Sequence, residues 1–149
     1  MEAVVFVEIQ GAGKSTFYRD RFFATHVRIN LDMLKTRHRE RLFLACCLDA
    51  LQPFVVDNTN ASSSERQVYL KAVRERNFRV VGYYFQSRVS DCIQRNAERS
   101  GKAQLPERAI LGTAARMEIP TRSEGFDELW YVRIDESGKF VVEEWRDEV

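Results

Sequence analysis

The sequence predicts an α/β domain with a mostly parallel central sheet, helices on both faces of that sheet and a β-hairpin at its C-terminal end. Apolar runs of strand length alternate with helix-like segments along all 149 residues. The first run, Ala3–Ile9, is apolar at nearly every position, which is typical of a strand buried on both faces of a parallel sheet. No repeat, low-complexity segment or linker interrupts the alternation. We therefore expect residues 1–149 to form one domain.

The first third of the chain supplies the elements on which a site could be built. Glycines follow the strand Ala3–Ile9, and the segment Lys14–Phe23 after them has helical character. Val27–Asn30 is a second short strand. Leu31–Leu51 contains neither proline nor glycine, which predicts one long helix. Pro53 then opens a third strand, which ends near Asp57.

The middle of the chain continues the alternation. Ser62–Asn77 begins with serines, which are preferred helix N-caps, and continues as a helix. Phe78–Phe85 is a β-rich run and predicts the fourth strand. Gln86–Arg99 is expected to be helical. Glu107–Met117 is a further helix, after a loop that contains glycine and proline.

Two β-rich runs close the chain. Glu128–Ile134 and Lys139–Trp145 flank the turn sequence DESGK. Strand-like runs on either side of such a turn predict an antiparallel hairpin. The sheet is therefore expected to be mostly rather than wholly parallel.

The composition describes an ordinary globular protein. Hydrophobic residues make up 44% of the chain and charged residues 30%. No apolar run approaches the roughly 20 residues that span a bilayer, so no membrane association is expected. The adjacent pair Cys46–Cys47 lacks metal-site spacing, and residues 1–9 lack a secretory start, so a cytoplasmic protein is expected. The net charge of +1 gives no global attraction for nucleic acid, although Lys35–Arg41 is a local basic run that is otherwise read as a solvated helix face.

A glycine-rich segment follows the first strand. In the sequence QGAGKST, two glycines allow backbone conformations closed to other residues, so that backbone amides can surround an anion at the start of a helix. A lysine in this position reaches the β- and γ-phosphates of ATP, and the serine hydroxyl after it binds Mg²⁺. We expect ATP to be bound by Gly11, Ala12, Gly13, Lys14, Ser15 and Thr16, with Ser15 as a metal ligand.

One residue departs from the phosphate-loop pattern. The pattern requires glycine six residues before the lysine, and Glu8 stands there. Its side chain either points away from the phosphates or faces them, and in the second case like charge weakens ATP binding. A tolerated variant, a damaged or engineered site, and a regulatory or non-catalytic adaptation are three interpretations of this change.

The motifs in order resemble one family. The segments GAGKSTF, INLDMLK, VVDNTN, RNAERSGKAQLP and IPTRSEGF are similar, in order and spacing, to the 5′-kinase domain of polynucleotide kinase/phosphatase enzymes, within the adenylate-kinase-like P-loop kinases. The resemblance covers nearly the whole chain. It implies a single P-loop kinase domain that uses ATP and Mg²⁺, with Arg116–Phe126 near the adenine.

The resemblance also assigns an acceptor site. It implies that Asp32 is the general base for the acceptor hydroxyl, with a helix cap as the alternative. Lys35 stands where the family often has an arginine that contacts the acceptor phosphate, so it keeps the charge but not the bidentate geometry. Asp57 is implied to help order Mg²⁺ and to shape the acceptor site with Thr59 and Asn60, with a simple Asx-turn as the alternative.

A lid is implied at about residues 95–110. Arg95 and Arg99 lie four residues apart and are expected to share a helix face, from which they neutralise charge on the transferred phosphoryl group. Arg99 is also expected to contact the nucleotide. The alternative is a surface face on which these arginines pair with Asp91 or Glu98.

Three functions are consistent with these features. The first is transfer of the γ-phosphoryl group of ATP to the 5′-hydroxyl of a polynucleotide or oligonucleotide, with release of ADP. The second is a kinase for a nucleoside, sugar or other small alcohol, which the near-neutral net charge favours. The third is a nucleotide-binding protein without transfer activity, for which Glu8 is the main argument.

Overall fold

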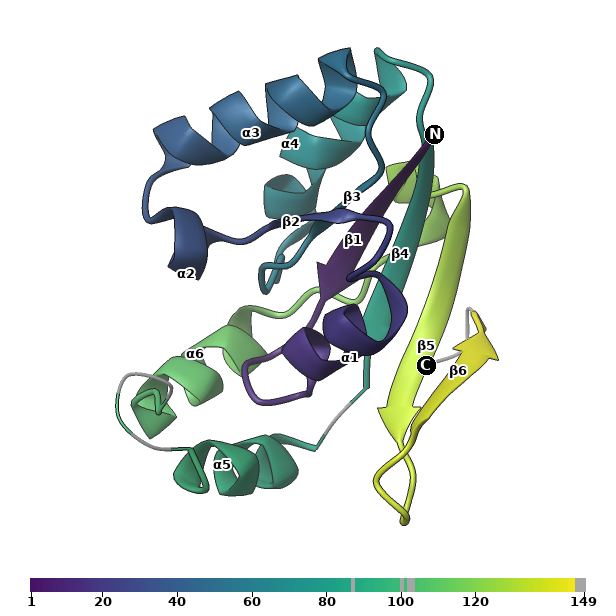
Figure 1. Ribbon diagram of the computed structural model, residues 1–149. Coiled ribbons are helices and arrows are strands. Elements are labelled where there is room, and N and C mark those ends of the chain that lie inside the picture. The colour runs from purple at the N-terminus through teal and green to yellow at the C-terminus, as the bar shows by residue number, and fades with distance from the viewer. Residues whose placement is uncertain (87, 100, 102–103, 147–149) are drawn as a thin grey trace.

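The central feature of the fold is one six-stranded sheet. The computed structural model describes residues 1–86, 88–99, 101 and 104–146 (Figure 1). The strands lie in the order β2-β3-β1-β4-β5-β6. All neighbouring pairs are parallel except β5 and β6, which are antiparallel. The mostly parallel sheet and the C-terminal hairpin are both confirmed.

The element bounds agree with the expected ones except in two helical segments. The strands are β1 Glu2–Val7, β2 Val27–Ile29, β3 Phe54–Val56, β4 Arg79–Phe85, β5 Glu128–Ile134 and β6 Phe140–Glu144. The helices are α1 Lys14–Arg21, α2 Leu31–Leu34, α3 Arg37–Asp49, α4 Ser63–Arg74, α5 Val89–Ala97, α6 Glu107–Arg116 and the short 3₁₀ helix η2 Arg122–Glu124. Within the described part of the chain, no helix has the length and apolar character to cross a membrane.

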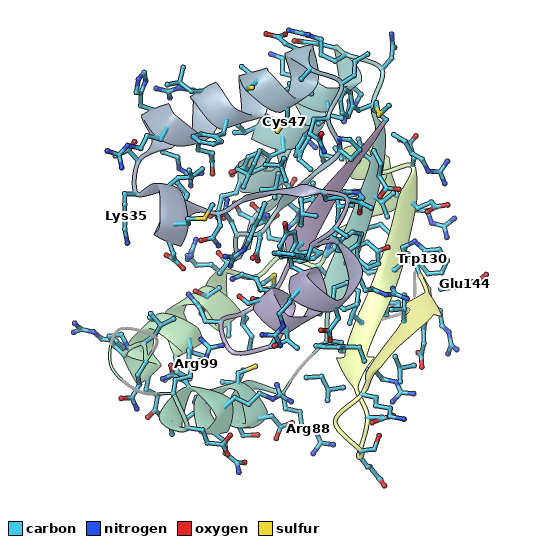
Figure 2. The ribbon with its side chains drawn as sticks, in the orientation of Figure 1. Lys35, Cys47, Arg88, Arg99, Trp130 and Glu144 are labelled. Atoms are coloured by element: carbon cyan, nitrogen blue, oxygen red, sulfur yellow. The ribbon has the colours of Figure 1, made fainter. Side chains whose placement is uncertain are left out.

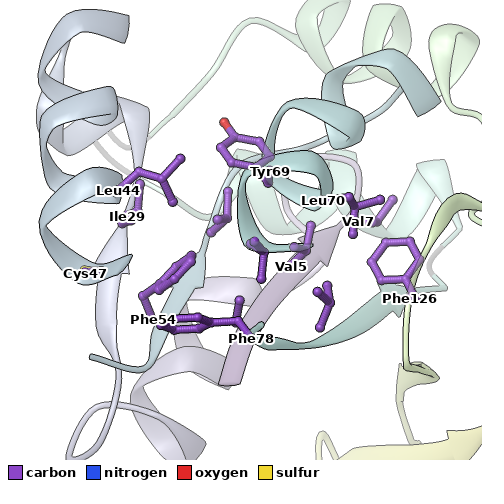
Figure 3. Packing of buried hydrophobic residues seen from close by; sticks show 14 of the residues in the cluster. Val5, Val7, Ile29, Leu44, Cys47, Phe54, Tyr69, Leu70, Phe78 and Phe126 are labelled. Atoms are coloured by element: carbon purple, nitrogen blue, oxygen red, sulfur yellow. The ribbon is translucent and has the colours of Figure 1, made fainter. Parts of the chain in front are cut away.

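Helices cover both faces of the sheet, as the alternation predicted. In β1 the side chains of Ala3, Val5 and Val7 pack in the cluster formed with α3 and α4 (Figure 3). Val4 and Phe6, the residues between them, pack in the cluster formed with α1, α5 and α6. Because all five residues are fully buried, β1 is the core strand of both layers, and each buried valine or phenylalanine contributes about 1.5–3 kcal/mol relative to exposure.

The expected long helix Leu31–Leu51 is wrong, because the structure divides it into α2 and α3. Lys35 lies between them with a φ of 74°, a left-handed conformation that a helix cannot contain. The Thr36 hydroxyl then accepts a hydrogen bond from the Arg39 amide and caps α3. The signal of this break in the sequence is Thr36, because threonine is a favoured N-cap residue. No glycine or proline accompanies it.

The expected helix Gln86–Arg99 is also shorter in the structure. It begins at Val89 and ends at Ala97, so Arg99 lies beyond it. The Asn96 side chain both donates to the Leu105 carbonyl (2.6 Å) and accepts from the Leu105 amide (2.8 Å), which holds Leu105 against the end of α5. The prediction that Arg95 and Arg99 share one helix face is therefore wrong.

A glycine in β4, Gly82, lies in close contact with β5 and with the loop before it. A Cβ on Gly82 would lie 2.7 Å from Leu129 Cδ2 and 2.8 Å from Phe126 Cε1. We expect Gly82→Ala to lower the free energy of unfolding by about 1–3 kcal/mol through overpacking, as measured by urea denaturation. Gly112→Ala in α6 is the control, since no atom lies within 4 Å of its added Cβ; an equal loss in the control variant would contradict the explanation.

Candidate active site

The functional segments meet at one edge of the sheet. Because β1, β2, β3 and β4 are parallel, their carboxyl ends lie at the same edge. The glycine loop follows β1, the segment with Asp32 follows β2, and Asp57 follows β3. The Glu8 amide donates to the Thr59 carbonyl (3.0 Å), which joins the first and third of these segments.

The glycine loop has the backbone that its sequence predicts. Gly11 and Gly13 have φ values of 86° and 98°, which favour glycine. A Cβ on Gly11 would also lie 2.7 Å from the Cys92 carbonyl oxygen. Helix α1 begins at Lys14 and has no acidic residue in its first turn. Its N-terminal amides and partial positive charge are thus available to an anion at the loop.

Glu8 points into the loop and binds its lysine. The side chain of Glu8 is 1% exposed, and its Oε1 lies 3.0 Å from Lys14 Nζ. The other carboxylate oxygen, Oε2, is buried and has no hydrogen-bond partner in the described structure. The reading in which Glu8 points away from the phosphates is therefore wrong. In this structure the carboxylate holds the ammonium group that the motif provides for a phosphate.

The pKa values of Glu8 and Lys14 are both raised in the folded protein. Burial raises the pKa of Glu8 to about 7, against the opposing effect of Lys14. Burial alone would lower the pKa of Lys14, but the carboxylates of Glu8, Asp57 and Asp32 together raise it. Lys14 therefore remains charged at neutral pH, whereas Glu8 changes its charge in the physiological range.

Asp57 is also buried and paired. Its Oδ2 accepts a hydrogen bond from Arg28 Nε at 2.6 Å, while its Oδ1 is buried and has no hydrogen-bond partner. Arg28 Nη2 also donates to Ser15 Oγ at 3.3 Å. The main interaction of the Asp57 side chain is thus an ion pair rather than an Asx-turn.

The two expected Mg²⁺ ligands, Ser15 and Asp57, both contact Arg28. A hydroxyl and a carboxylate are suitable donors for Mg²⁺, and Ser15 and Asp57 supply them. The Arg28 guanidinium, however, lies between the two donors and binds both. As arranged, the residues do not fit a metal ion coordinated by Ser15 and Asp57 together.

The expected general base lies at the open side of the site. Asp32 is in the first turn of α2 and is exposed, and its charge contributes to the raised pKa of Lys14. Asn30, not Asp32, caps α2 by accepting from the Met33 amide at 3.0 Å. The cap alternative for Asp32 is therefore wrong. Lys35 is exposed at the end of α2, from which it projects in Figure 2.

The residues after Asp57 differ in their surroundings. Asn60 is buried, and its side chain donates to the Phe6 carbonyl at 2.7 Å, so it braces the end of β1. Thr59 is half-buried. Asn58 accepts from the Leu31 amide at 2.9 Å and so positions the start of α2. Contact of Thr59 and Asn60 with an acceptor stays a prediction, and the role of Asn58 follows from the structure.

The two lid arginines take separate positions. Arg95 Nη1 donates to the Gly11 carbonyl at 3.1 Å, which ties α5 to the glycine loop. Arg99 follows the end of α5 and lies near α5 and α6 in Figure 2. Neither arginine pairs with Asp91 or Glu98 among the residues that the structure describes. Three positions of the expected lid, 100 and 102–103, lie outside the described residues.

The structure also contains a cavity between α5 and the C-terminal hairpin, which the sequence did not predict. It has a volume of about 730 Å³, and Figure 2 shows Arg88 between α5 and the hairpin. It is lined by Gln86, Arg88, Asp91, Arg95, Arg133, Ile134, Asp135 and Glu136. In the segment Arg116–Phe126, Glu124 is bound to Arg66 of α4. The implied position of this segment near the adenine stays a prediction. The cavity needed the hairpin and α5 to be placed in space before it could be recognised.

The sequence matches one protein family and one curated protein. The family described as AAA domain matches residues 41–120. The bifunctional polynucleotide phosphatase/kinase of Schizosaccharomyces pombe is 29% identical over 132 residues, which is 84% of this chain and 32% of that protein. The chain thus spans about a third of the length of this relative.

Solved structures share the fold at low sequence identity. A gluconokinase from Sinorhizobium meliloti 1021 has a TM-score of 0.59 and 18% identity, over 91% of this chain and 83% of that one. Kti12 from Chaetomium thermophilum, solved in complex with ADP-AlF3, has a TM-score of 0.62 and 14% identity, over 91% and 92%. A structure of the PezAT toxin-antitoxin system of Streptococcus pneumoniae has a TM-score of 0.65 and 11% identity, over 93% and 70%.

Proposed function

The chain belongs to the AAA domain family as a P-loop kinase-like domain, and from this membership we propose that it transfers the γ-phosphoryl group of ATP to a hydroxyl group. The acceptor that we propose is the 5′-hydroxyl of a polynucleotide or oligonucleotide. The single observation that carries the proposal is the convergence of Lys14, Asp32 and Arg95 at one edge of the sheet, around the glycine loop.

The nucleotide side of the proposed site is the glycine loop. The backbone amides of Gly11–Thr16 and the start of α1 bind the triphosphate, and Lys14 binds its β- and γ-phosphates. Lys14 reaches the phosphates when it leaves Glu8, its partner at 3.0 Å. ATP binding in this protein is thus an exchange of one anionic partner of Lys14 for another.

The acceptor side is the start of α2. The exposed carboxylate of Asp32 accepts the proton of the acceptor hydroxyl as the hydroxyl oxygen attacks the γ-phosphorus and the bond to the leaving ADP oxygen breaks. Asn30 and Asn58 hold the first turn of α2 through hydrogen bonds to its amides. The proposed general base, Asp32, therefore lies on the short helix α2, which is held by residues at the ends of both β2 and β3.

Two further roles are proposed for α5 and its surroundings. One is to neutralise the charge of the transferred phosphoryl group, and the other is to bind the base of the nucleotide. Arg95 already contacts the glycine loop, and Arg99 follows α5, so both are candidates to neutralise the transferred phosphoryl group. The cavity between α5 and the hairpin, which Arg95 also lines, is a suitable place for the base and ribose. Closure of the segment 95–110 over the nucleotide remains part of the proposal.

Two observations bear on the choice of acceptor. The relationship to a polynucleotide phosphatase/kinase favours a 5′-hydroxyl of nucleic acid, and Lys35 and Arg41 of the basic run are exposed. Against this, Arg37 is already paired with Glu40, and Arg39 donates to a backbone carbonyl. Because part of the basic run is committed internally, a kinase for a small alcohol is the second candidate.

Phosphoryl transfer from labelled ATP tests the proposal. We expect label on DNA or RNA oligonucleotides with a 5′-hydroxyl and none on oligonucleotides whose 5′ end is already phosphorylated. We also expect the KM for the oligonucleotide to rise several-fold between about 50 and 200 mM salt, because phosphate contacts release counterions. Salt-independent transfer to a nucleoside or sugar supports the second candidate, and ATP binding without transfer to any alcohol contradicts kinase activity.

A further inference from the structure

Arg28 is the residue whose position the proposed reaction does not explain. It lies in β2, and its guanidinium bridges Asp57 Oδ2 (2.6 Å from Nε) and Ser15 Oγ (3.3 Å from Nη2). Asp57 directly follows β3, and Ser15 is in α1. These two side chains are the pair expected to hold a metal ion in P-loop enzymes. An internal cation therefore occupies the place between them.

The position of Arg28 is fixed on several sides. β2 and β3 are paired with Arg28 opposite Val55, and the Asp57 amide donates to the Ile29 carbonyl at 2.8 Å. The guanidinium carbon lies 5.8 Å from the centre of the Tyr18 ring, over its face. The Arg28 side chain is 30% exposed, whereas that of Asp57 is fully buried. The ion pair between Arg28 and Asp57 is therefore partly buried at the edge of the core and is not a surface ion pair.

The two buried carboxylates at this edge of the sheet are paired with cations of the chain itself. Glu8 is paired with Lys14, and Asp57 is paired with Arg28. Removing one partner of a buried pair leaves an uncompensated charge, which is strongly unfavourable. Without Arg28, Asp57 would be a buried carboxylate that has lost its ion-pair partner, and its Oδ1 already has no hydrogen-bond partner in the described structure.

We propose that Arg28 is a resident cation that takes the place of a divalent metal between Ser15 and Asp57. The free protein then binds no divalent cation there, and ATP binds with little dependence on Mg²⁺. The first consequence stands without the proposed function, and the second rests on it.

Manganese titration of the free protein, followed by electron paramagnetic resonance, tests the first consequence. We expect no site at Ser15 and Asp57 in the wild type. We expect Arg28→Ala to gain one site whose affinity for Mn²⁺ is at least tenfold higher than that of any Mn²⁺ binding by the wild type, and Arg28→Ala combined with Asp57→Asn to lose this site. Arg19→Ala is the matched control, since Arg19 is exposed and its removal changes the net charge equally.

Two results of this titration overturn the proposal. One is that the wild type binds Mn²⁺ as tightly as Arg28→Ala. The other is that Arg28→Ala gains no site. Because Arg28→Ala leaves Asp57 unpaired and is expected to be less stable, Arg28→Gln is a second variant. We expect its melting temperature to rise when Mn²⁺ is added, and a melting temperature unchanged by Mn²⁺ also overturns the proposal.

Calorimetric titration with ATP, in EDTA or in excess Mg²⁺, tests the second consequence. We expect the two Kd values of the wild type to agree within about threefold, and those of Arg28→Ala to differ by more than tenfold. A wild type that needs Mg²⁺ by more than tenfold overturns the proposal, because the metal then displaces the guanidinium. Absence of ATP binding under both conditions contradicts the proposed function, while the manganese titration still decides the role of Arg28.

Discussion

Replacing Asp32 by asparagine is expected to lower the rate of phosphoryl transfer by about 100- to 10,000-fold, the usual contribution of a general base. The amide has the size of the carboxylate but cannot accept the proton of the acceptor hydroxyl. Asp32 is exposed, and the cap of α2 is Asn30, so the change removes no contact that supports the fold. Single-turnover transfer from labelled ATP measures the effect directly.

Two controls separate this loss from a structural defect. The melting temperature and the Kd for ATP of Asp32→Asn should stay close to those of the wild type. Asp49→Asn is the matched variant: Asp49 is an exposed carboxylate at the end of α3, paired with Arg76, and its change should leave the transfer rate unaltered. If Asp32→Asn keeps the full rate, the base has been assigned to the wrong residue.

Glu8→Gln is expected to bind ATP about fivefold to several hundredfold more tightly than the wild type. The wild-type carboxylate lies 3.0 Å from Lys14 Nζ, so it competes with the phosphates and repels them. One unit charge at about 4 Å is worth roughly 1–4 kcal/mol, depending on screening, and about 1.4 kcal/mol corresponds to tenfold in affinity. Isothermal titration calorimetry at pH 8, where Glu8 is mostly ionised, gives both Kd values.

Glutamine is a sharper test than glycine, the residue that the motif requires. Glu8→Gly also removes the whole side chain from a buried position and frees the backbone, so we expect tighter ATP binding from it together with some loss of stability. Agreement between Glu8→Gln and Glu8→Gly would assign the effect to the charge. Equal or weaker ATP binding by both variants would contradict the competition between Glu8 and phosphate.

The raised pKa of Glu8 makes the same competition depend on pH. As the pH falls from 8 to 6, Glu8 gains a proton, with a pKa of about 7, and Lys14 loses its charged partner. Wild-type affinity for ATP should therefore rise towards low pH by more than that of Glu8→Gln, in which only the titration of ATP remains. The same shift makes the free energy of unfolding depend on pH. Because the folded state binds the Glu8 proton more tightly than the unfolded state, the stability of the protein falls as the pH rises from 4.5 to about 7.

The sequence by itself determined the architecture and the location of the site. Alternating apolar runs predicted the mostly parallel sheet and its helical layers, because a strand such as β1, which is apolar from Ala3 to Val7, needs helices on both faces. Gly11 and Gly13 predicted the loop, because their φ values are strained for other residues. The order of the motifs predicted the family, and the parallel strands brought Asp32 and Asp57 to the loop edge.

Only the tertiary structure decided what those residues contact. Arg28 follows Ser15 by 13 residues and precedes Asp57 by 29, and no periodicity links them; their contact exists because β2 pairs with β3 beside α1. The direction of Glu8 likewise depends on burial at the end of β1, where Lys14 is its ionic partner. Local patterns determine backbone elements, whereas ion pairs between elements depend on distances that arise only when the sheet is assembled. The charges that complete this site were therefore visible only in three dimensions.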